Sequence, residues 1–363
     1  MKIIKTFFLL HTIPIILMGA YLTDVPVELN QPDGAILYCF ASGDEYYSRL
    51  HDSDDYTITQ SNEDGYYYYA LLEDGDIIPS TLRADQQQDF ARAGIKKRIM
   101  IPKEEYLAIR DRWWDGVETR DAPTTGTVNN LNVFIRFADE EEFGNARSYY
   151  DGYFNDENGP SMKDYFYEVS YEMLTVNTIH YPISDMDSNL SYQDEYPRSY
   201  YQPYNAVTNP EGYTEQERTG REHTLLQNAI TFIESEVPDT LNIDADDDGN
   251  VDNVTFLVYG QPGGWAELLW PHRWALYSVE SYIHDKRVWD YNFNLASGPY
   301  FSVGTLCHEF CHSLGAPDLY HYYDDVAPVA VGGWDVMDAS TDIPQWPSAY
   351  IKYRYFDWIE LQD

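Results

Sequence analysis

The segment 305–318, TLCHEFCHSLGAPD, limits what this chain can become more than any other stretch of it. It contains the pattern H-E-x-x-H. On a helix, side chains four positions apart lie on one face, so His308 and His312 can direct two imidazoles at one metal ion. Glu309 follows the first histidine and can reach a water molecule on that metal. A catalytic zinc site needs three protein ligands and an open fourth position. The segment therefore predicts a helix that carries such a site.

The residues around this pattern predict how the helix is placed and where a third ligand comes from. A helix from about Ser302 to Leu314 would have an apolar stripe on the face away from the histidines, formed by Val303, Leu306, Phe310 and Leu314. Gly315 would end it, because the residue after a helix often needs a positive φ. The chain then turns, Pro317 stiffens it, and Asp318 can return as the third ligand. Cys307 and Cys311 are interpreted as small buried hydrophobic residues.

Gly315 and Asp318 stand at the offsets of the metzincin pattern, although metzincins usually have a histidine as third ligand. An aspartate adds negative charge beside the metal and weakens its pull on a bound water. Glu309 then matters more as the general base that takes the proton of that water. Met337 lies in the downstream segment GGWDVM, 332–337, where it predicts a Met-turn, a hydrophobic floor under the metal site.

Taken together, these motifs resemble the immune-inhibitor-A family of secreted bacterial metallopeptidases. The resemblance covers roughly residues 125–363. It implies that His308, His312 and Asp318 bind zinc, that Glu309 is the catalytic base and that Met337 makes the Met-turn. Residues 22–98 resemble the propeptide-like region of such proteins, so the resemblance also implies a zymogen.

The composition excludes some classes of partner. The 61 acidic and 23 basic residues give a formal net charge of −38. Phosphate backbones and anionic membranes would repel such a chain, so we expect no nucleic-acid partner. We expect protein or peptide substrates and a monomer.

The N-terminus has the features of a secretory signal peptide. Lys2 and Lys5 precede an apolar run from Thr6 to Ala20 that is short for a membrane span. We assign residues 1–20 to this signal and expect a secreted protein without membrane integration after cleavage. A retained anchor is the alternative.

The fold class that we expect is α/β, an α+β zincin/metzincin-like catalytic domain preceded by a small β-rich domain. Residues 21–98 alternate short apolar runs with Asp-Gly turns, which predicts an antiparallel meander. Residues 99–129 are a connector with a helix over Lys103–Trp114. Residues 130–363 form the catalytic domain. Its expected elements are strands over 131–137, 174–179 and 254–259, and helices beginning at Ser161, Glu222 and about Ser302.

A second metal candidate lies in the acidic run 244–252, DADDDGNVD. Carboxylates at loop positions 1, 3, 5 and 9 with glycine at position 6 follow the calcium loop of EF-hands, but a strand follows instead of a helix. The expected calcium ligands are Asp244, Asp246, Asp248, the backbone carbonyl of Asn250, and Asp252. A solvated acidic turn is the alternative.

Four weaker candidates complete the set. His272 either lines the substrate cleft or satisfies buried polar groups. Tyr350 can stabilise an oxyanion. Cys39 can block the zinc as a thiolate, although its place in an apolar strand argues for burial. The basic run 96–98, KKR, is either a processing site between the domains or a basic patch.

These observations predict a secreted, zinc-dependent endopeptidase that also binds calcium. Two other functions remain open: a catalytically silent, metal-containing binding or adhesion module, and a zinc hydrolase of a non-peptide bond.

Overall fold

The computed structural model describes residues 22–86, 90, 94–114, 122–261, 268–321, 323, 328 and 330–360. The predicted signal peptide lies outside these residues, as does part of the predicted connector, 115–121. Within the described ranges, no helix is both long and apolar enough to cross a membrane.

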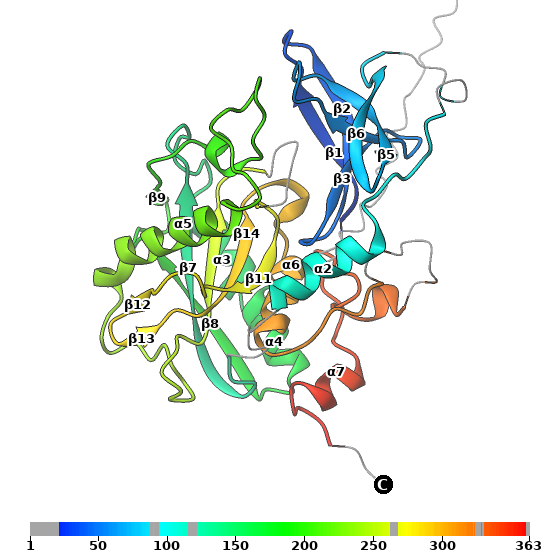
Figure 1. The fold of residues 1–363 in the computed structure, drawn as a ribbon. Coiled ribbons are helices and arrows are strands. Elements are labelled where there is room, and N and C mark those ends of the chain that lie inside the picture. The colour runs from blue at the N-terminus through cyan, green and yellow to red at the C-terminus, as the bar shows by residue number, and fades with distance from the viewer. Residues whose placement is uncertain are drawn as a thin grey trace, which may run out of the picture.

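The first part of the chain folds into a six-stranded antiparallel sheet whose strands follow one another in sequence order. It appears in blue in Figure 1. The meander predicted from the Asp-Gly turns is confirmed: Asp74 and Gly75 between the last two strands have φ angles of 53° and 101°, as a tight hairpin requires. The strands are β1 (Leu22–Asn30), β2 (Ile36–Gly43), β3 (Ser48–His51), β4 (Thr57–Gln60), β5 (Tyr67–Glu73) and β6 (Asp76–Arg83).

A helix then connects this sheet to the rest of the molecule. It is α2 (Lys103–Trp114), with the bounds predicted from the sequence. Tyr106 of α2 is buried in the same hydrophobic cluster as residues of the second sheet. The helix therefore packs between the two parts of the chain and links them physically.

The second sheet is mixed, and its strand order is β11-β14-β10-β7-β8, with β9 beside β7. Strands β8, β7, β10 and β14 run parallel, and β11 pairs antiparallel with β14 at one edge. The strands are β7 (Gly126–Arg136), β8 (Leu174–Tyr181), β9 (Tyr192–Gln193), β10 (Val254–Val258), β11 (His272–Ala275) and β14 (Asp290–Leu295). A short hairpin, β12 (Tyr282–Ile283) and β13 (Lys286–Arg287), stands apart from it.

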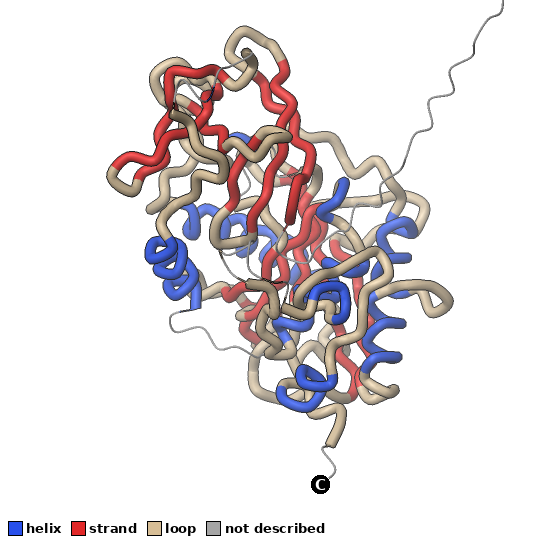
Figure 2. Tube along the Cα trace, turned by 90° about the vertical axis from the view of Figure 1, so that its right-hand side faces the viewer, coloured by secondary structure: helices blue, strands red, loops and turns tan. Residues whose placement is uncertain are grey.

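Helices cover both faces of this second sheet. Successive residues of a strand point to opposite faces, so neighbouring residues of one strand pack against different helices. Leu131, Val133 and Ile135 of β7 pack in one cluster with α5 (Arg218–Ile233). Phe134, between them, packs in the other cluster, with α3 (Arg147–Asn155), α4 (Met162–Val169) and α6 (Val303–Ser313). Figure 2 shows strands in the middle of this part of the molecule with helices on either side. The predicted mixed α/β class is confirmed.

Several element bounds differ from the sequence-based ones. Strand β7 begins at Gly126, inside the predicted connector, and α5 begins at Arg218 instead of Glu222. The polar stretch 184–222, for which no regular element was predicted, contains β9 and a 3-10 turn, η1 (Arg198–Tyr201). The remaining short elements are η2 (Glu234–Glu236), η3 (Gly298–Tyr300), η4 (Gly332–Trp334) and α7 (Ala349–Arg354).

Candidate metal centre

Helix α6 carries the H-E-x-x-H pattern and has the expected caps. At its start, the Ser302 hydroxyl accepts a hydrogen bond from the backbone N–H of Thr305 at 3.0 Å. At its end, Gly315 has a φ of 97° and its N–H donates to the carbonyl of His312 at 2.8 Å. Every residue of the helix is buried. The helix predicted over 302–314 is confirmed.

A buried polar network fixes α6 to the second sheet. The Asn292 side-chain amide of β14 donates to the backbone carbonyl of Glu309 and to the hydroxyl of Ser313, both at 3.1 Å. The Ser313 hydroxyl in turn donates to Asn253 at 3.2 Å, and Asn253 donates to Asn130 of β7 at 2.7 Å. Because buried polar groups need partners, these bonds set the position of α6 on the sheet. The sequence interpretation missed them, although asparagines at alternate strand positions, such as 130 and 132 or 292 and 294, are an unusual signal.

Three side chains converge in front of α6. The Nε2 atoms of His308 and His312 are 3.1 Å apart, and the Asp318 Oδ1 atom lies 3.1 Å from the first and 3.3 Å from the second. Ligands about 2.0–2.1 Å from a tetrahedral zinc ion are about 3.3 Å from one another. The triangle thus has the size that a zinc ion requires, and its two imidazoles and one carboxylate are ordinary zinc ligands.

Backbone carbonyls orient both imidazoles. The Nδ1 atom of His308 donates to the carbonyl of Val336 at 2.9 Å, and that of His312 donates to the carbonyl of Ala316 at 2.7 Å. With the proton on Nδ1, the lone pair of Nε2 faces the centre of the triangle. These two carbonyls hold the imidazoles in place, and sequence patterns cannot reveal them because any residue has a carbonyl.

Charge at the triangle favours a cation. Burial lowers the pKa of His308, but the carboxylates of Asp318 and Glu309 outweigh burial and raise it to about 9. Burial raises the pKa of Asp318, but the two imidazoles outweigh it and hold that pKa well below its usual range. The surroundings therefore stabilise positive charge at the centre of the three donors.

Glu309 is fully buried beside the two histidines. Neither of its carboxylate oxygens has a hydrogen-bond partner among the described residues. Burial has the largest effect on the pKa of Glu309 and raises it. The charges of His308 and His312 lower this pKa, and repulsion by Asp318 raises it further. A buried carboxylate without partners is costly, so the Glu309 carboxylate calls for a partner that is not among the described residues.

Met337 lies in the predicted downstream turn and is fully buried in the cluster that holds α6. Its carbonyl accepts a hydrogen bond from the N–H of Leu319 at 2.8 Å, next to Asp318. Its N–H donates to the Asp335 carboxylate at 2.9 Å. The 336–337 segment therefore holds both the loop that carries Asp318 and, through Val336, the ring of His308.

The structure brings together three of the five expected calcium ligands. Oxygen atoms of Asp244, Asp246 and Asp252 lie within 4.8 Å of one another. Asp248 lies outside this group, and its carboxylate accepts bonds from the backbone and side-chain amides of Asn250. Burial raises the pKa of Asp252 to about 7, and the neighbouring aspartates add to this. Lys286 contacts Asp244 at 2.6 Å and supplies one positive charge to the loop.

The weaker candidates lie elsewhere. His272 is buried in β11, where its Nδ1 contacts the carbonyl of Trp270 at 2.7 Å and its Nε2 contacts Glu222 at 3.0 Å. This arrangement is the buried-polar alternative of the sequence analysis. Tyr350 is 58% exposed on α7, with its ring against that of Tyr355. Cys39 is 3% exposed in the core of the N-terminal sheet, and burial raises its pKa to about 12, so it supplies no thiolate. Cys307 and Cys311 are buried and free, as expected.

Neither the family models nor the curated proteins compared with this chain match it. Among solved structures, the chain is similar to the crystal structure of metalloproteinase-II from Bacteroides fragilis. The sequence identity is 13% and the TM-score is 0.27, over 92% of this chain and 85% of that one. A similarity of this size carries no argument about function. Any proposal about function must therefore be based on the residues of this chain.

Proposed function

We propose that this chain is a secreted zinc-dependent endopeptidase. The observation that carries the proposal is the triangle of His308, His312 and Asp318, with donor separations of 3.1–3.3 Å. Beside it lies the carboxylate of Glu309, which has no hydrogen-bond partner in the described part of the chain. Three protein ligands with an open position are the features of a catalytic rather than a structural zinc site.

Each residue has a role in this proposal. A zinc ion in the triangle would supply the Lewis acid that polarises the scissile carbonyl. Glu309 accepts the proton of the attacking water and passes it to the leaving amine, as a carboxylate with a raised pKa is suited to do. The carbonyls of Val336 and Ala316 keep the two imidazoles in the productive tautomer.

The arrangement around the triangle supports a metzincin-like peptidase of the immune-inhibitor-A type. A glycine with positive φ ends the metal-binding helix, and a buried methionine follows the third ligand in the sequence. Strand β11 pairs only on one side within the described sheet, so an extended peptide can add to its other edge. Secretion through the signal 1–20, a monomeric state and synthesis as a zymogen belong to the same proposal.

Calcium is proposed for the second site. Asp244, Asp246 and Asp252 gather at the turn before the fully buried strand β10, and oxygen ligands from carboxylates suit this cation. A bound calcium ion would clamp this turn and stabilise the fold without entering the reaction.

Replacing the base tests the proposed reaction. The full-length chain is assayed on casein before and after limited trypsin treatment, in parallel with Glu309→Gln. The substitution is nearly isosteric and removes the proton acceptor. We expect chelator-sensitive cleavage by the parent chain, and a fall in kcat/KM of at least about 100-fold in the variant, with the zinc content unchanged.

Glu141→Gln, which makes the same change on an exposed side chain, is the matched control and should retain full activity. Zinc-loaded parent chain that cleaves no peptide after trypsin treatment would contradict the peptidase proposal. Cleavage that survives Glu309→Gln would contradict the role of this base.

A further inference from the structure

A cleft of about 480 Å³ lies between the N-terminal sheet and the loop 202–209. Its volume is within the range of about 300–1,000 Å³ that small-molecule sites usually have. Strands β1, β4 and β5 and the turn after β4 supply one wall, and the loop supplies the other. None of the candidate zinc or calcium ligands is among its described lining residues. A ligand bound here would therefore be separate from both metal sites.

Side-chain amides hold the two walls of this cleft together. Gln60 of β4 donates a hydrogen bond to the Thr208 hydroxyl at 3.1 Å. Across the same seam, Asn205 donates to the Ser61 carbonyl at 3.2 Å. Asn209 donates to three backbone carbonyls at 2.8–3.3 Å, which fixes the shape of the loop. The cleft is thus built by the fold and needs no ligand to form it.

The lining of the cleft is polar but almost uncharged. Six of the thirteen described lining residues are asparagine or glutamine, two are threonine and two are tyrosine. Glu28 is the one charged residue among these thirteen, in a chain that has 61 acidic and 23 basic residues. The composition of the cleft therefore differs from that of the chain as a whole.

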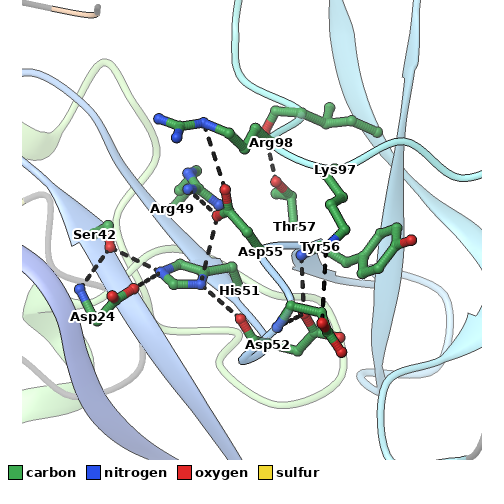
Figure 3. A network of polar contacts seen from close by, with 12 residues as sticks. Asp24, Ser42, Arg49, His51, Asp52, Asp55, Tyr56, Thr57, Lys97 and Arg98 are labelled. Carbon is green, nitrogen blue, oxygen red and sulfur yellow. Dashed lines mark hydrogen bonds and ion pairs between the residues drawn. The ribbon is translucent and has the colours of Figure 1, made fainter. Parts of the chain in front are cut away.

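Charged side chains of the N-terminal sheet gather elsewhere. Figure 3 shows Arg49 and Arg98 beside Asp55, and Lys97 beside Tyr56. None of the residues labelled there lines the cleft. Because no basic residue is among the described lining residues, an anion finds no counter-charge in the cleft. A single carboxylate is also too few ligands for a metal ion. The ligand that fits is polar and neutral.

Three of the six amides are available to such a ligand. The side chains of Asn30, Asn62 and Gln202 make no hydrogen bond to another described residue. A primary amide both donates and accepts hydrogen bonds, as a sugar hydroxyl does. Tyr204 is 46% exposed, and its ring stacks on no other ring in the described part of the chain. Such a ring is a flat apolar surface on which the C–H face of a sugar can pack.

We propose that this cleft binds a short neutral saccharide. Its hydroxyls pair with the amides of Asn30, Asn62 and Gln202, and one of its rings packs on Tyr204. A peptide main chain would also pair with amides. It has no C–H ring face for the tyrosine, however, and it is usually bound by the main-chain groups of a strand edge. The inference depends neither on a metal nor on the proposed peptidase activity.

Saturation-transfer NMR tests this inference with four neutral disaccharides: maltose, cellobiose, lactose and N,N′-diacetylchitobiose. The uncut, full-length chain is used, because both walls of the cleft belong to it. We expect at least one disaccharide to bind with a Kd on the order of 1 mM or tighter. Its binding should not change with salt concentration, because no charge pair forms. Absence of saturation transfer to all four would overturn the inference.

Two variants and two matched controls locate the binding. Tyr204→Ala and Asn62→Ala should each raise the Kd at least about fivefold, as the loss of one ring contact or hydrogen bond implies. Tyr282→Ala removes a ring of nearly equal exposure, 44%, from β12, and Asn158→Ala removes another exposed amide. Both controls should bind as the parent chain does. All four side chains are exposed, so the Tm of each variant should equal that of the parent.

The other outcomes of this experiment contradict the proposal. Binding that is unchanged in both Tyr204→Ala and Asn62→Ala would place the saccharide elsewhere and overturn the inference. Saturation transfer to tetraglycine, but to none of the disaccharides, would overturn it in favour of a peptide main chain. Because casein cleavage is not the readout, failure of the peptidase proposal would leave each of these results interpretable.

Discussion

At the scale of single residues, the surroundings of a side chain decide its chemistry more than its type does. Glu309 and Glu222 are both buried glutamates, yet burial and Asp318 raise the pKa of the first, whereas contacts with His272 and Tyr291 lower that of the second against the effect of burial. The first is suited to exchange a proton and the second to remain ionised. His223 of α5 shows the same dependence on surroundings, and its effect on the pH dependence of stability can be measured.

His223 is fully buried, and burial lowers its pKa to about 4 from the ordinary 6.5. As the pH falls below 6.5, the unfolded chain binds a proton that the folded chain does not, so stability decreases until the pH reaches about 4. The difference is about 2–3 kcal/mol between pH 7 and pH 4.5. His223→Gln should remove this part of the pH dependence, as measured by urea unfolding at both pH values.

Ser278→Ala is the control for this prediction. It removes the hydroxyl that contacts His223 at 2.6 Å but leaves the imidazole and its burial in place. It should therefore keep most of the pH dependence of the parent chain. Identical pH dependence in His223→Gln and the parent would show that this histidine is not the group responsible.

At the scale of elements, the first turn of helix α6 packs closely against the backbone of Thr341. A Cβ atom on Gly304 would lie 2.2 Å from the carbonyl oxygen of Thr341 and 2.9 Å from its nitrogen. Backbone cannot yield as a flexible side chain does. Gly304→Ala should therefore displace the start of α6, destabilise the fold by about 1–3 kcal/mol and weaken zinc binding.

The chain offers a matched control within another helix. A Cβ atom on Gly220 of α5 would have open space around it, with no tertiary neighbour within 4 Å among the described residues. Gly220→Ala should therefore be neutral or stabilise by up to about 1 kcal/mol, because alanine favours helix. Thermal unfolding and zinc titration of both variants measure the contrast. Equal effects of the two substitutions would contradict the tight packing of α6.

The acidic loop before β10 predicts a calcium effect on stability. Calcium binds only the folded loop, so it should raise Tm in a concentration-dependent way. Asp252→Asn removes a buried member of the group and should reduce this rise, whereas Asp74→Asn, in a turn of the N-terminal sheet, should not. No rise in Tm at millimolar calcium would favour the alternative, a solvated acidic turn in which Lys286 alone neutralises Asp244.

Patterns of residues close in sequence made the main helices and strands predictable. The candidate metal site was predicted from one such pattern, the H-E-x-x-H segment. Ser302, the spacing of His308 and His312, and Gly315 are close in sequence, so α6 and its candidate ligands could be located by pattern alone. The Asn292 contact to Glu309 and the Val336 contact to His308 could not, because they join distant segments. Strand β11 was missed because it is short and all of its side chains are buried, which leaves no alternation to detect.

At the scale of the whole molecule, the N-terminal sheet contacts the chain near the candidate metal ligands, because Glu45 accepts a hydrogen bond from Tyr320, two positions after Asp318. The candidate ligands belong to helix α6 and the loop after it, beside the second sheet, and Glu45 belongs to a turn of the first sheet. The expected division into a propeptide-like region and a catalytic region stays a prediction. A sequence pattern reads each region separately, so the approach of Glu45 to the residues near Asp318 became apparent only in three dimensions.

The central claim is that His308, His312 and Asp318 bind one zinc ion. Anomalous diffraction at the zinc edge from crystals of the zinc-loaded Glu309→Gln chain tests it most directly, because this variant cannot digest itself. We predict one strong peak about 2.0–2.2 Å from both Nε2 atoms and from an Asp318 carboxylate oxygen. No peak there, or a peak with Asp318 turned away from both imidazoles, would contradict the proposed centre.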